Sequence, residues 1–149
     1  MKAAIPVFAS AAILLCSATA LGQTKDGADL VKEIQNFCQQ VDNTWNTKGP
    51  VAVANTLFAE DVVFVPPDGA LVKGNETVAK MWGDIYKEPT THTCKVAGAS
   101  ANGDGAWAYG EVTITGKPAG HVRWTAFDIK QNGQWKVQML HVTPIKEKE

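Results

Sequence analysis

Four polar residues of the sequence have side chains suited to ligand binding or proton transfer. Asp42 lies in an amphipathic segment, and Arg123, Thr125 and Gln138 lie in two strand-like segments further along the chain. The guanidinium group of Arg123 would suit a carboxylate or an enolate, which it can bind through charge-assisted, bidentate hydrogen bonds. Asp42 could act as a base, or it could form a buried ion pair with Arg123, which needs no ligand. Binding, catalysis and a purely structural pair are therefore all open.

Several common catalytic patterns are missing from the sequence. It has no H-x-H or H-E-x-x-H motif, so we expect no metal site. It also has no glycine-rich phosphate loop and no G-x-S-x-G motif, and we expect no cofactor. His92 and His121 have no partner at a suitable spacing, and His141 is interpreted as a structural or interfacial residue.

Length and charge restrict the class of protein. The chain has 149 residues, of which 45% are hydrophobic and 19% charged, with a net charge of −1. This length suits one domain with a real core, and this composition is typical of a globular protein. The charge gives no basic surface for nucleic acid, so we expect no such partner.

The N-terminal residues 1–22 have the pattern of a cleavable signal peptide. Lys2 is the positive start, and residues 3–15 are apolar but too few to span a bilayer. Two cleavage sites are open, Ala18-Thr19-Ala20 before Leu21 and Ala20-Leu21-Gly22 before Gln23. A buried core helix is the alternative. We therefore expect a mature domain over residues 23–149, secreted or periplasmic, with no membrane association after cleavage.

The three cysteines bear on the compartment. Cys16 lies in the signal segment, and lipidation there is an alternative, although Leu15 precedes it where lipoproteins carry a small residue. Export would leave Cys38 and Cys94 in an oxidising compartment. They are either bridged, which would pin the first helix to a strand, or two separate buried thiols.

Hydrophobic periodicity predicts an α+β fold. Asn132-Gly133 is a strong signal for a two-residue hairpin turn. A polar stripe lies beside the apolar face of the first helix and consists of Gln35, Gln39, Asp42 and Asn46. We expect helices over 29–47, 50–58 and 76–87 and strands over 62–65, 91–99, 105–115, 121–131 and 134–143, with a further short strand before Gly74.

Two stretches of the sequence resemble the NTF2-like superfamily. One is F-A-E-D-V-V-F-V-P-P-D-G, from Phe58 to Gly69, followed by a helix containing Trp82. The other is N-G-Q-W-K-V-Q-M-L-H-V-T-P, which ends at Pro144. The nearest match is the secreted SnoaL-like group. The resemblance implies a cone of three N-terminal helices on a strongly curved, mostly antiparallel sheet. It says little of function, because this fold hosts isomerases, dehydratases, hydrolases, transport factors and assembly domains.

Alignment with ketosteroid isomerase, a member of that superfamily, argues against its chemistry. The positions of its general base, oxyanion-hole tyrosine and oxyanion-hole aspartate fall on Pro66, Asp42 and Thr125. None of the three groups is preserved, and proline cannot accept a proton. Whether the protein is an enzyme is therefore left open, with Asp42 and Arg123 as the best catalytic candidates.

The same alignment, with the hairpin turn fixing the register, predicts which side chains face the interior of the cone. Arg123, Thr125 and Phe127 would point inward, and Trp124 and His141 would point outward. Small residues of the preceding strand would leave space for a ligand. The predicted ligand-binding set is Asp42, Trp45, Trp82, Arg123, Thr125, Phe127, Gln138 and Leu140.

The outer face would expose a large apolar area, which a monomer rarely does. We therefore expect a homodimer formed through Trp107, Tyr109, Trp124, Val137 and Met139. The favoured function is an exported protein that binds a small apolar or carboxylate-bearing ligand. One alternative is an isomerase, dehydratase or hydrolase that uses Asp42 with Arg123 or Thr125, and the other is a structural dimerisation module with a filled cone.

Overall fold

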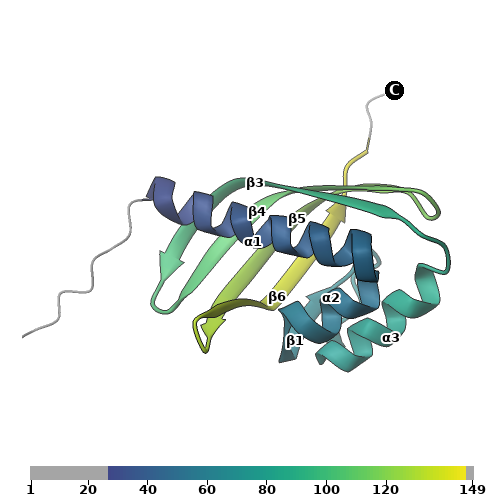
Figure 1. Ribbon diagram of the computed structural model, residues 1–149, viewed down its shortest axis with the longest axis horizontal. Helices are drawn as coiled ribbons and strands as arrows, with labels where there is room; N and C mark the ends of the chain where they lie inside the picture. The colour runs from purple at the N-terminus through teal and green to yellow at the C-terminus, as the bar shows by residue number, and fades with distance from the viewer. Residues whose placement is uncertain (1–26, 147–149) are drawn as a thin grey trace, which may run out of the picture.

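Three helices and one curved sheet form within residues 27–146, the part of the chain that the computed structural model describes (Figure 1). The predicted signal segment, residues 1–22, lies outside these residues. α2 has Pro50 in its first turn, a position that needs no N–H donor. α3 begins at Asn75, with Gly74 at the N-cap position. The helices are α1 (Gly27–Lys48), α2 (Pro50–Leu57) and α3 (Asn75–Ile85).

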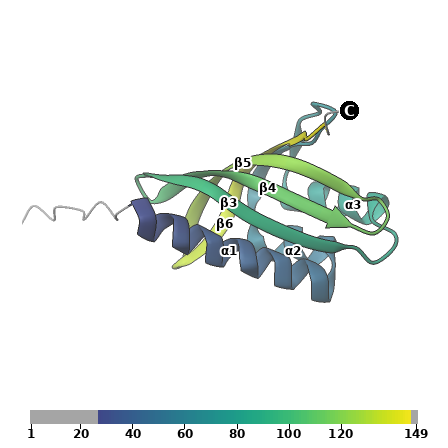
Figure 2. The same ribbon diagram turned by 90° about the horizontal axis from the view of Figure 1, so that it is seen from above.

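The sheet has the order β2-β1-β6-β5-β4-β3, and only the β1–β6 pair is parallel. Figures 1 and 2 show α1 lying along β3, with α2 and α3 gathered at one end of the sheet. This arrangement confirms the predicted α+β cone. The strands are β1 (Phe58–Val65), β2 (Val72–Lys73), β3 (Thr91–Asn102), β4 (Gly105–Thr115), β5 (Gly120–Gln131) and β6 (Gln134–Pro144).

Polar side chains of α1 pair with the free edge of β3. Because β3 ends the sheet, the backbone groups of every second residue have no neighbouring strand to bond with. Three α1 side chains accept hydrogen bonds from N–H groups of this edge, as the backbone of a further strand would. The pairs, with the acceptor first, are Asn46 with His92 (2.7 Å), Asp42 with Cys94 (3.1 Å) and Gln35 with Val96 (2.9 Å).

A disulfide strengthens the same contact between α1 and β3. Cys38 and Cys94 are bridged, with their Cα atoms 5.6 Å apart and a separation of 56 positions in the sequence. Cys38 lies on the face of α1 that carries Asp42, so the disulfide and the hydrogen bonds both join this face of α1 to β3. Of the two alternatives for these cysteines, the structure shows the bridged one.

Removing the bridge should lower the stability of the protein markedly. The Cys38→Ala/Cys94→Ala variant is expected to lose about 3–4 kcal/mol of unfolding free energy, because the unfolded chain regains the entropy of a long closed loop. Urea denaturation measures this loss. Wild-type protein treated with a reductant is the control and should lose a similar amount, whereas an unchanged midpoint in both samples would contradict the prediction.

The β5–β6 hairpin contains an extra residue that the sequence did not reveal. From the Asn132-Gly133 turn, the pairing runs as expected as far as Asp128 opposite Val137. The next residue of β5, Phe127, pairs with Met139, so Gln138 is bulged out of the ladder. Beyond the bulge, each β5 residue meets a β6 residue one position later than predicted.

The predicted inward face is wrong for β5 and is right for β6 only beyond the bulge. Trp124 is opposite Val142, and Trp124 is buried together with Ala126 and Asp128. Arg123 and Thr125, predicted to face inward, are exposed on the outer face. On β6, Leu140 lines the interior as predicted, together with Val142, and His141 is exposed as predicted.

Candidate functional site

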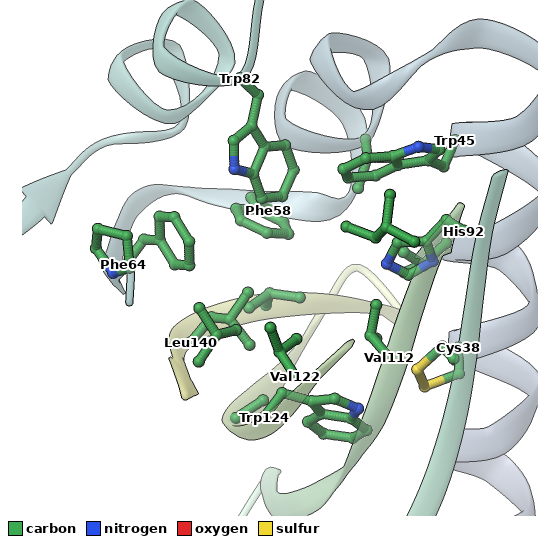
Figure 3. Close-up of a pocket in the computed structure, with 18 of the residues that line it drawn as sticks. Cys38, Trp45, Phe58, Phe64, Trp82, His92, Val112, Val122, Trp124 and Leu140 are labelled. Carbon is green, nitrogen blue, oxygen red and sulfur yellow. A yellow bond between two sulfur atoms is a disulfide. The ribbon is translucent and has the colours of Figure 1, made fainter. Parts of the chain in front are cut away.

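A cavity of about 190 Å³ lies between α1, α3 and the concave face of the sheet, so the cone is not completely filled. It is smaller than the roughly 300–1,000 Å³ of sites for drug-sized ligands. It is larger than the ~150 Å³ engineered cavity that is known to bind benzene. Its size therefore suits a compact molecule of about one ring. Figure 3 shows aromatic side chains on one wall, namely Trp45, Trp82, Phe58 and Phe64, and mainly aliphatic ones opposite, namely Val112, Val122 and Leu140 with Trp124.

The aromatic wall is held together by ring-to-ring contacts around Trp82. The rings of Trp45, Phe58 and Phe64 have their centroids 5.3, 5.2 and 5.8 Å from that of Trp82, in tilted or edge-on geometry. These separations lie in the favourable range for aromatic pairs. Trp45 comes from α1, Trp82 from α3 and both phenylalanines from β1, so three elements build one wall. The predicted lining residues Trp45, Trp82 and Leu140 do line the cavity.

Asp42 pairs with His92 and not with Arg123. Its Oδ1 atom lies 2.6 Å from His92 Nδ1, and the two side chains are only 18% and 9% exposed. The His92 ring stacks on Trp45 with a centroid distance of 4.7 Å, and Trp45 Nε1 donates to Thr90 Oγ1. His92 is part of the cavity wall (Figure 3). With Nδ1 bonded to a carboxylate, Nε2 is the ring nitrogen left to meet a ligand.

Asp128 places a carboxyl group in this apolar surrounding. The residue is 2% exposed, lines the cavity and is flanked across the sheet by Ala106 and Val137. Its Oδ1 atom has no hydrogen-bond partner among residues 27–146. Burial disfavours the charged form and raises the pKa of Asp128 to about 7. The carboxyl group is therefore poised between its neutral and ionised forms near neutral pH.

Asp128 should make the stability of the protein depend on pH. The folded-state pKa of about 7 exceeds the ordinary value of 3.8. As the pH rises between these values, the unfolded chain loses a proton that the folded chain keeps, so the free energy of unfolding falls and then levels off above pH 7. The expected loss between pH 5 and pH 8 is roughly 2–3 kcal/mol.

Asp128→Asn removes this titration and should flatten the profile, so the variant gains stability relative to wild type as the pH rises. Urea denaturation at several pH values measures both profiles. Asp104→Asn, in the exposed β3–β4 turn, is the control and should leave the wild-type profile unchanged. Parallel profiles for wild type and Asp128→Asn would contradict the assignment.

Five of the eight residues predicted to bind a ligand do not line the cavity. One of them is Asp42, which contacts the cavity wall through His92. The Arg123 side chain is 72% exposed and its Nε atom lies 3.4 Å from Glu111 Oε1. The Asp42–Arg123 pair, one of the alternatives that the sequence left open, therefore does not form. Thr125 is exposed on the same face of β5. Phe127 packs on Trp107, and Gln138, the bulged residue, donates to Asp61.

The outer face differs in part from the predicted apolar surface. Three of the predicted interface side chains are exposed, namely Trp107 (44%), Tyr109 (56%) and Met139 (37%). Large apolar side chains of an interface would be exposed in this way in an isolated subunit. Trp124 and Val137 are instead buried in the interior. Homodimer formation through this face stays a prediction.

Reasoning from the sequence missed His92 and Asp128. A signal existed for His92, because H-T-C-K-V alternates and places His92 on the same face as Cys94 and Val96, both buried. Asp128 follows Trp124 and Ala126 at the same spacing of two. Their apolar character favoured the inward face, but the alignment assigned it to Arg123 and Thr125.

Neither a metal site nor a membrane-spanning helix is found in the part of the chain that the structure describes. No three His, Cys, Asp or Glu side chains between residues 27 and 146 are grouped as metal ligands would be. Over the same residues, every helix is too short or too polar to cross a bilayer.

Three helices on a curved, mixed sheet that encloses an apolar cavity define an NTF2-like α+β cone. The family model of the SnoaL-like domain matches residues 38–137, and the chain belongs to this family. No curated protein matches the sequence.

Solved structures with low sequence identity share the fold. An NTF2-like protein of unknown function from Shewanella oneidensis is 13% identical, with a TM-score of 0.66, over 76% of this chain and 98% of its own. A protein of unknown function from Mycobacterium tuberculosis is 20% identical, with a TM-score of 0.66, over 80% and 74%. A proposed scytalone dehydratase from Novosphingobium aromaticivorans is 17% identical, with a TM-score of 0.64, over 79% and 87%.

Proposed function

We propose that the protein binds a small, uncharged and largely apolar molecule of about one ring. The observation that carries this proposal is the apolar cavity with its wall of contacting aromatic rings. Burying an apolar ring there is favourable by roughly 25 cal/mol per Å² of surface removed from water. We do not propose a carboxylate-bearing ligand, because Arg123 faces outward and no Lys or Arg is among the described residues that line the cavity.

We further propose that the protein acts outside the cytoplasm and as a homodimer. The signal-peptide pattern of residues 1–22 supports export, and the Cys38–Cys94 bridge is compatible with an oxidising compartment. The exposed side chains of Trp107, Tyr109 and Met139 support self-association.

Filling the cavity should abolish binding. In the Leu140→Trp variant, the larger ring would occupy ligand space, so the affinity for toluene should fall at least tenfold relative to wild type. Met139→Trp is the matched control, because the neighbouring residue points to the outer face and its substitution leaves the cavity intact. Ligand-observed NMR with toluene measures both affinities. Equal binding by the two variants, or none by wild type, would contradict the proposal.

A second candidate function is proton transfer by the Asp42–His92 pair. A carboxylate that holds one ring nitrogen of a histidine orients the other as a general base or acid. Here the distance is 2.6 Å, the pair is largely buried and His92 lines the cavity. This geometry supports an isomerase or dehydratase that acts on a carbonyl compound, with His92 in place of the expected Arg123 or Thr125. The similarity in fold to a proposed scytalone dehydratase agrees with this candidate.

Such an enzyme would exchange the α-protons of a bound ketone with solvent. With cyclohexanone in D₂O, we expect wild type to accelerate exchange and His92→Gln to lose about 10²–10⁴-fold of that acceleration, the usual contribution of a general base. Asp42→Asn should lose less, and His141→Gln, on the exposed face of β6, should lose none. Proton NMR follows the exchange. If wild type exchanges no faster than buffer, or if His92→Gln matches wild type, this candidate fails.

A further inference from the structure

We propose that the ligand carries an alcoholic or phenolic hydroxyl group and that this group pairs with the carboxyl oxygen of Asp128. This inference rests on the proposed binding of a small ring compound and adds the chemical class of the ligand. None of the described contacts gives the Asp128 carboxyl group a role in holding the fold together.

The backbone aims Asp128 into the cavity. On β5, the inward side chains alternate along the strand, and those that line the cavity are Val122, Trp124, Ala126 and Asp128. Asp128 is 2% exposed, so water outside the molecule does not reach it. Its neighbours across the sheet, Ala106 and Val137, are aliphatic and cannot form hydrogen bonds through their side chains.

An unpaired carboxyl oxygen in such a place is costly. A buried polar atom that leaves its hydrogen-bond capacity unused destabilises a protein, because it has given up its bonds to water and formed none in their place. No atom of residues 27–146 forms a hydrogen bond with Asp128 Oδ1. A Val or an Asn at this position would not bury an acidic group. The cost is recovered when a ligand brings a donor to this oxygen.

Among simple groups, a hydroxyl fits this carboxyl best. The pKa of Asp128 is about 7, so both protonation states occur near neutral pH. A hydroxyl can donate to the ionised form and both donate to and accept from the neutral form, whereas a ketone can pair only with the neutral form. A carboxylate would be repelled by the ionised form, and an ammonium ion would lose its hydration in an apolar cavity.

Trp124 supplies a second, independent indication of an oxygen-bearing ligand. Its Nε1 atom is buried and has no partner among residues 27–146. The indole N–H can only donate, so the group it requires is an acceptor such as a hydroxyl, ether or carbonyl oxygen. Trp124 lines the same cavity from the same strand (Figure 3).

The test compares two ring compounds that differ in one group. p-Cresol has a hydroxyl where p-xylene has a methyl, so the two are almost equal in shape. The measured quantity is the ratio of their dissociation constants, p-xylene over p-cresol, determined by ligand-observed NMR. We expect Asp128→Val to lower this ratio about tenfold relative to wild type, because the hydroxyl loses its partner, and to leave p-xylene binding near the wild-type value.

Two further variants make the result specific. Asp128→Asn keeps the shape and one acceptor oxygen, so its ratio should lie between those of wild type and Asp128→Val. Thr125→Val, on the outer face of the same strand, should leave the ratio unchanged.

The outcomes separate this inference from the proposed function. If both compounds bind and Asp128→Val leaves their ratio unaltered, the hydroxyl does not pair with Asp128 and the inference is overturned, while the binding function stands. That result would also be expected if a water molecule served as the partner of Asp128. If neither compound binds to wild type, the proposed function itself fails.

Discussion

The hydrogen bonds between α1 and the edge of β3 are the interaction on which the rest of the structure depends. Gln35, Asp42 and Asn46 satisfy the backbone of an edge strand that would otherwise be open to another chain. They fix both the angle and the position of α1 along the sheet. Since Asp42 accepts from the Cys94 backbone with one oxygen and contacts His92 with the other, the same bonds orient the one histidine of the cavity wall. Fold and site therefore share one set of contacts.

Much of this arrangement could be predicted from the sequence. The apolar face of α1, the Asn132-Gly133 turn and the alternating strands are local patterns, and local patterns predict elements well. The polar stripe of α1 was also visible, but its partner was not, because a stripe of this kind is equally compatible with solvent. Pairing with a strand edge depends on which strand ends the sheet, and this is decided by long-range topology.

The candidate site was harder to predict, because one residue changed its geometry. A bulge at Gln138 has no signature in a single sequence, and a shift of one residue turns a side chain to the other face. The alignment that chose Arg123 and Thr125 therefore carried its error through β5, although it stayed correct for Leu140. The apolar character of Trp124 and Ala126 compared with their neighbours was physical evidence for the opposite choice. Burial of large apolar side chains outweighs a distant alignment at such a position.

The disulfide has a consequence for how the protein matures. Cys38 and Cys94 line the cavity as well as joining α1 to β3. A newly made chain forms this link only when its two thiols are oxidised. Until then, hydrogen bonds and packing alone hold α1 against β3. Oxidation would therefore limit how far these two walls of the cavity can move apart.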